Sequence, residues 1–178
     1  NVVERHIFKR YIRTTGASIK NRGMHDLKAY IEKDIELDPE GTKYCYKFDI
    51  KKFYESIDQD FMMYALRRMF KGKVLLTMLE RFVRMMPSGL SIGLRSSQGF
   101  GNLLLSMFLD HYLKDNIGVK HFYRYCDDGV VLAGNKKTLW TIRDMVHDRA
   151  KIMHLSIKDD ERVFPTKTGI DFLGYVIY

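Results

Sequence analysis

The sequence contains little cysteine and no long apolar run, and these absences exclude several classes of protein. Its two cysteines, Cys45 and Cys126, have no CxxC spacing. They make neither a disulfide framework nor a zinc site, and we expect both to be reduced, buried side chains. No apolar stretch approaches the roughly 18 residues that a membrane-spanning helix needs, and no signal-peptide pattern opens the chain. The sequence therefore predicts a cytoplasmic protein with no membrane partner.

Positive charge exceeds negative charge along the chain. There are 30 Lys and Arg residues against 22 Asp and Glu residues, which gives a net charge of +8. Part of the excess lies early, where four acidic residues oppose eight basic ones: Arg5, Lys9, Arg10, Arg13, Lys20, Arg22, Lys28 and Lys33. Such a distribution suits a polyanionic partner, because each neutralised phosphate releases counterions. The hydrophobic fraction of 46% is ordinary for a globular protein.

Hydrophobic periodicity and turn residues predict an α+β domain. Helices are expected over residues 2–12, 24–35, 58–70, 74–86, 96–113 and 136–153. Asp58 is the expected N-cap of the third helix, and Ser96 or Ser97 that of the fifth. Strands are expected over residues 44–50, 119–125, 130–133, 161–164 and 170–178. This order predicts an antiparallel sheet backed by helices.

Three carboxylates stand at the ends of predicted elements, where core packing would not place them. Asp49 closes an apolar strand, and Asp127 and Asp128 form the tip of a predicted hairpin. If the two strands pair, the three carboxylates converge, and oxygen ligands without His or Cys favour Mg²⁺ or Mn²⁺. Two such ions side by side would activate an attacking hydroxyl and stabilise a leaving phosphate group. The alternative is that Asp-Asp-Gly is only a favourable hairpin turn.

Three segments of the sequence resemble motifs of the reverse transcriptases. Residues 48–54, Phe-Asp-Ile-Lys-Lys-Phe-Tyr, resemble the first catalytic motif of that family, in which an aromatic residue follows the Asp by five positions. Residues 125–128, Tyr-Cys-Asp-Asp, resemble its Tyr-x-Asp-Asp box. A third segment resembles the hairpin that grips the primer end: Phe172, Leu173, Gly174 and Tyr175. Each motif alone is a weak signal, but the three occur in the order of the family.

The resemblance implies a right-hand polymerase fold. Residues 44–57 and 98–178 would form the palm, and residues 1–43 and 58–97 would form parts of the fingers, with no thumb. The sequence opens on Asn instead of Met, and the family has a triphosphate-binding finger strand before this region and a thumb after it. We therefore expect a fragment of a longer enzyme. The implied partners are an RNA template, a DNA or RNA primer and dNTPs.

The resemblance also implies roles at the carboxylate site. Asp49, Asp127 and Asp128 would be the catalytic metal ligands, and the Ile50 carbonyl would complete one metal site. Family members usually carry a lysine before the final hairpin that protonates pyrophosphate. In this sequence that role falls on either of two residues in a charged stretch, Arg162 or Lys158. A solvated run of charges is the alternative interpretation.

Tyr54, next to Phe53, stands where the family places a sugar gate. An aromatic ring beneath the incoming sugar would clash with a 2′-hydroxyl, so it would select dNTPs. The similar RNA-dependent RNA polymerases place a small or acidic group at this position. The alternative is that both rings only pack in the core of the palm.

The segment before the long helix departs from most reverse transcriptases, which carry Gln-Gly-x-x-x-Ser-Pro there. This chain has Ile92 in place of the Gln, and Ser97-Gln98 in place of Ser-Pro. Both changes resemble the enzymes of diversity-generating retroelements from bacteria and phages. The resemblance places Ile92, Gly93, Ser97 and Gln98 near the template and the nascent base pair, where Gly93 would let the backbone approach. That subtype implies errors at template adenines and a small basic accessory protein.

Several interpretations remain open at the level of sequence. The chain could belong to a group II intron-like or antiphage bacterial reverse transcriptase. It could also be a catalytically silent palm that only holds RNA, although the intact Asp49, Asp127, Asp128 and Tyr54 argue against such decay. Ile92 could simply pack beneath the fingers.

Overall fold

The computed structural model describes residues 2–19 and 21–178, so Asn1 and the early basic residue Lys20 lie outside the described residues. The helices are α1 (Val2–Phe8), α2 (Met24–Leu37), α3 (Phe53–Ser56), α4 (Gln59–Met69), α5 (Lys73–Val83), α6 (Arg95–Leu105), the π-helical η1 (Ser106–Asp110) and η2 (Tyr112–Asn116), α7 (Lys136–Ile152) and the 3₁₀ turn η3 (Thr166–Thr168). The strands are β1 (Thr15–Gly16), β2 (Tyr44–Asp49), β3 (His121–Tyr125), β4 (Asp128–Ala133), β5 (Arg162–Pro165), β6 (Ile170–Phe172) and β7 (Tyr175–Ile177). Within the described chain, no helix combines the length and the apolar character needed to cross a membrane.

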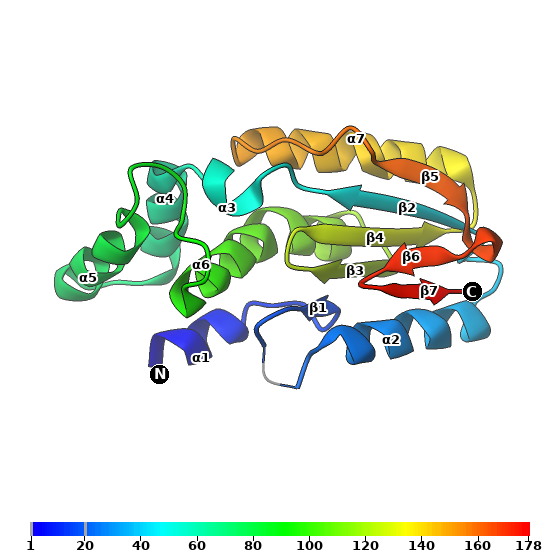
Figure 1. Cartoon of the computed structure of the whole chain (residues 1–178), viewed down its shortest axis with the longest axis horizontal. Coiled ribbons are helices and arrows are strands. Elements are labelled where there is room, and N and C mark those ends of the chain that lie inside the picture. The colour runs from blue at the N-terminus through cyan, green and yellow to red at the C-terminus, as the bar shows by residue number, and fades with distance from the viewer. Residues whose placement is uncertain (1, 20) are drawn as a thin grey trace.

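A five-stranded sheet in the order β1-β3-β4-β2-β5 forms the centre of the molecule (Figure 1). The pairs β3–β4, β4–β2 and β2–β5 are antiparallel, as predicted, whereas β1 pairs in parallel with β3. Strands β6 and β7 form a separate antiparallel hairpin. The chain therefore has the predicted mixed α+β fold, a sheet backed by helices.

Both faces of the sheet are buried, and alternating residues of each strand supply them. On β2, Tyr46 and Phe48 point into a core shared with α6 and α7, whereas Cys45 points into a second core beneath α2 and the β6–β7 hairpin. On β3, Phe122 and Tyr123 divide between the same two cores. The alternation of side chains along β2 therefore places its buried rings in the first core and Cys45 in the second.

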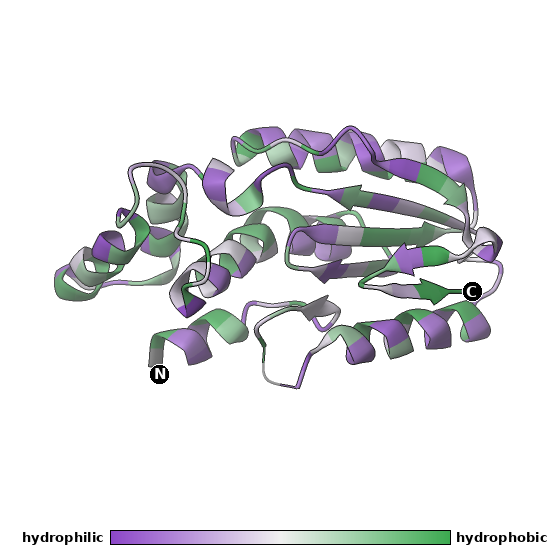
Figure 2. Cartoon of the chain, viewed as in Figure 1, coloured by the Kyte–Doolittle hydropathy of each residue, from purple (hydrophilic) through white to green (hydrophobic). Residues whose placement is uncertain are grey.

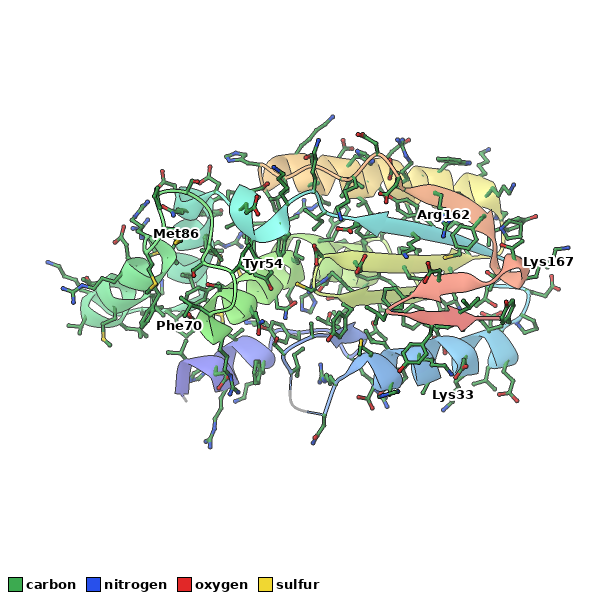
Figure 3. All side chains as sticks on the ribbon, in the orientation of Figure 1. Lys33, Tyr54, Phe70, Met86, Arg162 and Lys167 are labelled. Carbon is green, nitrogen blue, oxygen red and sulfur yellow. The ribbon has the colours of Figure 1, made fainter. Side chains whose placement is uncertain are left out.

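The remaining helices extend the first core to one side. Helices α4 and α5 form a lobe beyond α6, on the left in Figure 1, and Phe70 and Met86 lie in this lobe in Figure 3. Asp58 caps α4 as predicted, because its carboxylate accepts a hydrogen bond of 2.9 Å from the Phe61 backbone N–H. Figure 2 shows that α2 exposes a hydrophilic stripe while its apolar side faces the sheet.

The N-terminal helix is shorter than predicted, because the edge of the sheet competes for its backbone. It ends at Phe8 instead of residue 12. The hydroxyl of Thr14 donates to the Phe122 carbonyl at 2.6 Å, and the Arg124 N–H donates to the Thr14 carbonyl at 3.0 Å. These bonds draw residues 14–16 onto β3, so a segment for which no strand was predicted contains strand β1.

Other helix boundaries also differ from prediction. Helix α6 begins at Arg95, and neither Ser96 nor Ser97 caps it; Ser97 is instead buried inside its first turns. The helical path continues through η1 and η2 to Asn116 instead of stopping near residue 113. Helix α5 ends at Val83 rather than residue 86.

The C-terminal segment folds back on itself instead of forming the single strand predicted over residues 170–178. Strand β6 pairs with β7 across a turn at Leu173-Gly174, and both turn residues have positive φ, 56° and 79°. Glycine adopts this conformation without steric cost, so Gly174 permits the reversal. The resemblance-based interpretation of residues 172–175 as a hairpin agrees with this geometry.

Candidate active site

The register between β2 and β4 places two acidic residues directly opposite one another. Asp49, the last residue of β2, pairs with Asp128, the first residue of β4. Opposed residues of an antiparallel pair have Cβ atoms about 5 Å apart. Asp127 is the second residue of a two-residue turn and immediately precedes Asp128. The Asp127 carbonyl accepts a hydrogen bond of 3.3 Å from the Ile50 N–H. All three acids therefore lie at one edge of the sheet, on the left in Figure 1.

The hairpin differs in one respect from its predicted form. Only Cys126 and Asp127 form the turn, whereas Asp128 is already part of β4 and pairs with Tyr125. Figure 2 shows β4 changing from hydrophilic at this end to hydrophobic along the rest of its length. The position of Asp128 in a strand explains why it faces Asp49, because ladder pairing fixes its direction.

A close approach beneath the carboxylates depends on glycine. A Cβ at Gly129 would lie 2.2–2.7 Å from three ring atoms of Phe48, its partner across the ladder. The Phe48 ring therefore packs directly over the β4 backbone, next to the Asp49–Asp128 pair. Any larger residue at position 129 would push this ring away from the site.

The carboxylates are crowded and poorly compensated. The pKa of Asp128 is raised to about 6 by burial, then by the nearby charges of Asp49 and Asp127. Burial also raises the pKa of Asp49, against the opposing hydrogen bond from Lys158. One Asp49 oxygen, Oδ1, is buried without a hydrogen-bond partner. An unpaired buried acceptor is costly, so this edge of the sheet is an energetically unfavourable place for carboxylates on their own.

Whether these residues fit a divalent cation can be judged from their donor atoms. In the described part of the chain, no three His, Cys, Asp or Glu side chains already surround a point where one metal ion could sit. The donors at this edge are nevertheless carboxylate oxygens alone, and one of them, Asp49 Oδ1, is buried and unsatisfied. Hard oxygen donors of this kind fit Mg²⁺ or Mn²⁺. The donor chemistry of these residues therefore fits the predicted ions.

Lys158 is the cation that contacts Asp49 in this structure. Its Nζ donates to Asp49 Oδ2, and its backbone N–H donates to the Asp49 carbonyl at 2.8 Å. The other candidate acid, Arg162, lies on β5 with its guanidinium 4.9 Å from the centre of the Phe164 ring. Arg162, Asp49 and Asp128 line one cavity of about 270 Å³. Of the two candidates, only Lys158 touches a carboxylate of the site.

Tyr54 lies at the site, whereas Phe53 does not. The Tyr54 hydroxyl is 3.1 Å from the Cys126 Sγ in the turn that carries Asp127. Its ring also packs against α6, because a Cβ at Gly101 would approach Tyr54 and Phe53 ring carbons to 3.2 and 2.9 Å. Figure 3 shows Tyr54 between α3 and α6, beside the ends of the central strands. Phe53 is 2% exposed, so it is a core residue and cannot contact a nucleotide.

The segment predicted to face the template divides into two parts. Ile92 is 69% exposed, and Gly93 has a φ of 92° with open space around its Cα. Ser97 is buried, and Gln98 accepts a hydrogen bond from the Ser18 hydroxyl. Of these four residues, Ile92 and Gly93 are exposed, Gln98 is partly exposed, and Ser97 is closed to a large ligand.

The β6–β7 hairpin is fixed from two sides. Lys47 on β2 donates to the Asp171 carbonyl at 2.6 Å. The Tyr175 hydroxyl lies 3.1 Å from His25 Nδ1 on α2, and their rings are 5.7 Å apart. Phe172 is buried in the second core. The hairpin is thus held against β2 and α2. Lys47, which binds the hairpin, lies on the same strand as Asp49, close to the three carboxylates.

One buried group near the site, Arg124, was not predicted from the sequence. Arg124 is fully buried, and it binds both oxygens of Asp110 at 2.7 and 2.6 Å, Asn102 Oδ1 at 2.9 Å and the Cys126 carbonyl at 2.5 Å. The available signal was an arginine inside a strand that otherwise carries aromatic residues. Sequence alone could not have identified its partners, because they come from α6, η1 and the turn.

Comparison with protein families matches residues 7–177 to one family, described as reverse transcriptase (RNA-dependent DNA polymerase). A search of curated proteins finds no match. The family match covers nearly the whole chain and includes all three carboxylates.

Among solved structures, the chain is similar to yeast telomerases. Apo telomerase from Candida tropicalis superposes with a TM-score of 0.77 at 13% identity, over 99% of this chain and 37% of that one. Telomerase from Candida albicans, in complex with a fragment of telomeric RNA, gives a TM-score of 0.75 at 14% identity, over 98% of this chain and 35% of that one. These likenesses show a shared fold, and the chain spans little more than a third of either protein.

The Lys158–Asp49 pair leads to a first prediction. Lys158→Met removes the ammonium group that competes for Asp49, so we expect Mn²⁺ to bind more tightly in the absence of nucleotide. Half-exposed ion pairs contribute little, so the gain should be about two- to fivefold in the dissociation constant, measured by electron paramagnetic resonance. If Lys158 is also the general acid, primer extension by this variant should slow. Lys51→Met, at an exposed lysine with no ion pair in the described structure, is the control; unchanged or weaker Mn²⁺ binding by Lys158→Met would contradict the prediction.

Proposed function

The chain belongs to the reverse transcriptase (RNA-dependent DNA polymerase) family, and on that basis we propose that it is the nucleotidyl-transfer core of an RNA-directed DNA polymerase. One observation carries the proposal: the β2–β4 register sets Asp49 opposite Asp128, with Asp127 in the adjoining turn. The positive net charge of the chain supports a nucleic-acid substrate. One telomerase of the same fold is in complex with an RNA fragment, which supports RNA as the template here.

In the proposed reaction a primer 3′-hydroxyl attacks the α-phosphate of a dNTP and pyrophosphate leaves. Two divalent ions, Mg²⁺ or Mn²⁺, would supply activation of the hydroxyl and neutralisation of the phosphates. Asp49, Asp127 and Asp128 would hold them, together with the Ile50 carbonyl. Because phosphoryl transfer depends mainly on positioning and charge, these few groups suffice for the chemistry.

Other residues of the chain would orient the substrates. Lys158, already beside Asp49, is the better placed of the two candidates to donate a proton to the departing pyrophosphate. The β6–β7 hairpin, docked on β2 through Lys47, would hold the primer end. Ile92 and Gly93 are open to solvent and would face the template and the nascent base pair.

We propose a division of the chain into palm and fingers that follows from the positions of the strands and the carboxylates. Residues 44–57 and 98–178 contain strands β2 to β5 of the central sheet, the carboxylates and α7, and would form the palm. Residues 1–43 and 58–97 would be parts of the fingers. The α4–α5 lobe, which stands beside the sheet in Figure 1, supports an insertion at that point.

The central test is primer extension on an RNA template by the full-length protein. Asp127→Asn should reduce dNTP incorporation by about 100-fold or more, because a ligand charge is lost while the shape is kept. RNA affinity should remain unchanged, which separates a polymerase from a module that only holds RNA. Asp148→Asn, at an exposed position on α7, is the matched control. Extension by wild type that survives Asp127→Asn undiminished would refute the proposal.

Tyr54 is proposed as the sugar gate, on the strength of its position between the catalytic turn and α6. Tyr54→Ala should increase incorporation of rNTPs relative to dNTPs, because the ring no longer blocks a 2′-hydroxyl. Tyr54→Phe keeps the ring, loses only the contact with Cys126, and should remain selective for dNTPs. Steady-state incorporation of each nucleotide gives the ratio. Equal losses for rNTP and dNTP in Tyr54→Ala would show that the ring serves only for packing.

We further propose that the enzyme is of the diversity-generating retroelement type, from a bacterium or phage, and works in the cytoplasm with a small basic accessory protein. The support is the Ile92-Gly93 and Ser97-Gln98 pattern, and the exposure of Ile92. A group II intron-like or antiphage enzyme is the second candidate, favoured by the Tyr-x-Asp-Asp and primer-hairpin motifs alone.

The subtype proposal predicts frequent errors opposite template adenine. Ile92 offers no hydrogen-bonding group near the nascent pair, whereas Gln would offer both a donor and an acceptor. One hydrogen bond of about 0.5–1.5 kcal/mol permits up to about a tenfold change in discrimination. Sequencing of cDNA should therefore show fewer adenine errors with Ile92→Gln than with wild type or with the conservative Ile92→Val. Equal error rates in all three, or an accurate wild type, would contradict the subtype.

A further inference from the structure

We propose that Arg124 is a positioning residue that fixes the turn carrying Asp127, and thereby sets the affinity of the carboxylate site for its cation. The proposal rests on the proposed function. Its basis is the contact between Arg124 Nη1 and the Cys126 carbonyl, at 2.5 Å. That carbonyl belongs to the peptide bond that joins Cys126 to Asp127, so the guanidinium holds the orientation of the peptide that leads into Asp127.

The turn needs such a restraint because its first residue is strained. Cys126 has a φ of 54°, a conformation that residues other than glycine rarely adopt. Strained backbone of this kind persists only where the surroundings over-determine it. Arg124 holds the carbonyl of Cys126, and the Tyr54 hydroxyl lies 3.1 Å from its Sγ. Contacts to both its main chain and its side chain thus hold Cys126 in this conformation.

Arginine suits this task for geometric reasons. Its planar guanidinium presents several donors in a rigid fork. Nε and Nη2 are used on the two oxygens of Asp110, and Nη1 is shared between Asn102 Oδ1 and the Cys126 carbonyl. Asp110 is also fully buried and accepts a hydrogen bond of 3.1 Å from the Thr15 hydroxyl. The guanidinium therefore has no freedom to turn, and neither has the peptide that it holds.

Stability alone does not explain this arrangement. Burying two charges is costly, and buried ion pairs are often replaced by apolar residues with no loss of stability. Arg124 and Asp110 both have an exposed fraction of 0%. A buried charged pair that ends on the catalytic turn is better explained by the geometry it imposes there.

The π-helical segment η1 brings Asp110 into line with Asn102. In a continuous α-helix, two residues eight positions apart would be offset by about 80° around the axis. A π-turn takes up one more residue than an α-turn, and such turns occur often at functional sites. Because η1 spans Ser106–Asp110, it reduces this offset, so that Asn102 from α6 and Asp110 from η1 both reach Arg124.

The test measures Mn²⁺ binding to the full-length protein by electron paramagnetic resonance, without nucleic acid or nucleotide. Arg124→Lys keeps the charge, but a single Nζ with three donors cannot reproduce the four hydrogen bonds that the rigid guanidinium makes to Asp110, Asn102 and the Cys126 carbonyl. The dissociation constant for Mn²⁺ should rise about tenfold, the lower end of the effect of residues that orient metal ligands. The Mg²⁺ concentration for half-maximal primer extension should rise in parallel. An unchanged dissociation constant in folded Arg124→Lys protein would overturn the proposal.

If Arg124→Lys does not fold, a variant that removes only one hydrogen bond of Arg124 tests the same proposal. Asn102→Ala removes one acceptor of Nη1, the same nitrogen that binds the Cys126 carbonyl. It should raise the dissociation constant for Mn²⁺ about threefold, as expected for one lost hydrogen bond. If Asn102→Ala binds Mn²⁺ as tightly as wild type does, the proposal is wrong.

The matched control lies on the same strand. His121 is 4% exposed and contacts the carboxylates of Asp34 and Asp38, but at the end of β3 away from the turn. His121→Gln should lower the melting temperature and leave Mn²⁺ binding unchanged. An equal loss of Mn²⁺ binding in His121→Gln and Arg124→Lys would show a general loosening and refute the proposal. Absence of Mn²⁺ binding by wild type, or wild-type affinity in Asp127→Asn, would instead refute the proposed function, and this inference with it.

Discussion

The pairing of β2 with β4 is the constraint on which the rest of the structure depends. Six residue pairs join the two strands, from Tyr44 opposite Ala133 to Asp49 opposite Asp128. A slip of one residue would turn every side chain of β2 to the other face, since successive side chains alternate. Tyr46 and Phe48 would then exchange cores with Cys45, and the Asp49–Asp128 pair would be lost. The fit of the Phe48 ring over Gly129 also specifies this register, because no larger residue could stand there.

Local patterns predicted much of this arrangement. The Asp58 cap, the central strands, α7 and the position of the three acids all follow from periodicity, capping and turn residues, which act over a few positions. Strand β1 and the buried start of α6 did not follow, because both depend on partners far along the chain. Arg124 is the clearest case: its four acceptors come from three elements, and no spacing in the sequence connects them. Lys158 beside Asp49 is a contact of the same kind.

The carboxylates of the molecule fall into two groups with different electrostatic surroundings. Asp38 accepts hydrogen bonds from Lys120, His121 and the Gly41 N–H, and these lower its pKa. Glu161 is partly buried, which would raise its pKa, yet hydrogen bonds from Tyr46 and His147 and the Arg143 charge lower it. Asp128 has the opposite balance, with burial and like charges dominant. Partners within the protein thus stabilise the charged form of Asp38 and Glu161, whereas burial and like charges destabilise the charged form of Asp128.

The distance along the chain between the two opposed acids has a consequence for how the protein folds. Asp49 and Asp128 are separated by every element from α3 to β3, η1 and η2 included. Their strands can therefore pair only after a long loop has closed, at a substantial entropic cost. Non-local pairing of this kind slows folding. A chain emerging from the ribosome would carry Asp49 without its partner until β4 had been synthesised. A cation that needs both acids would then bind only molecules that have already joined β2 to β4, and would stabilise the folded state by mass action.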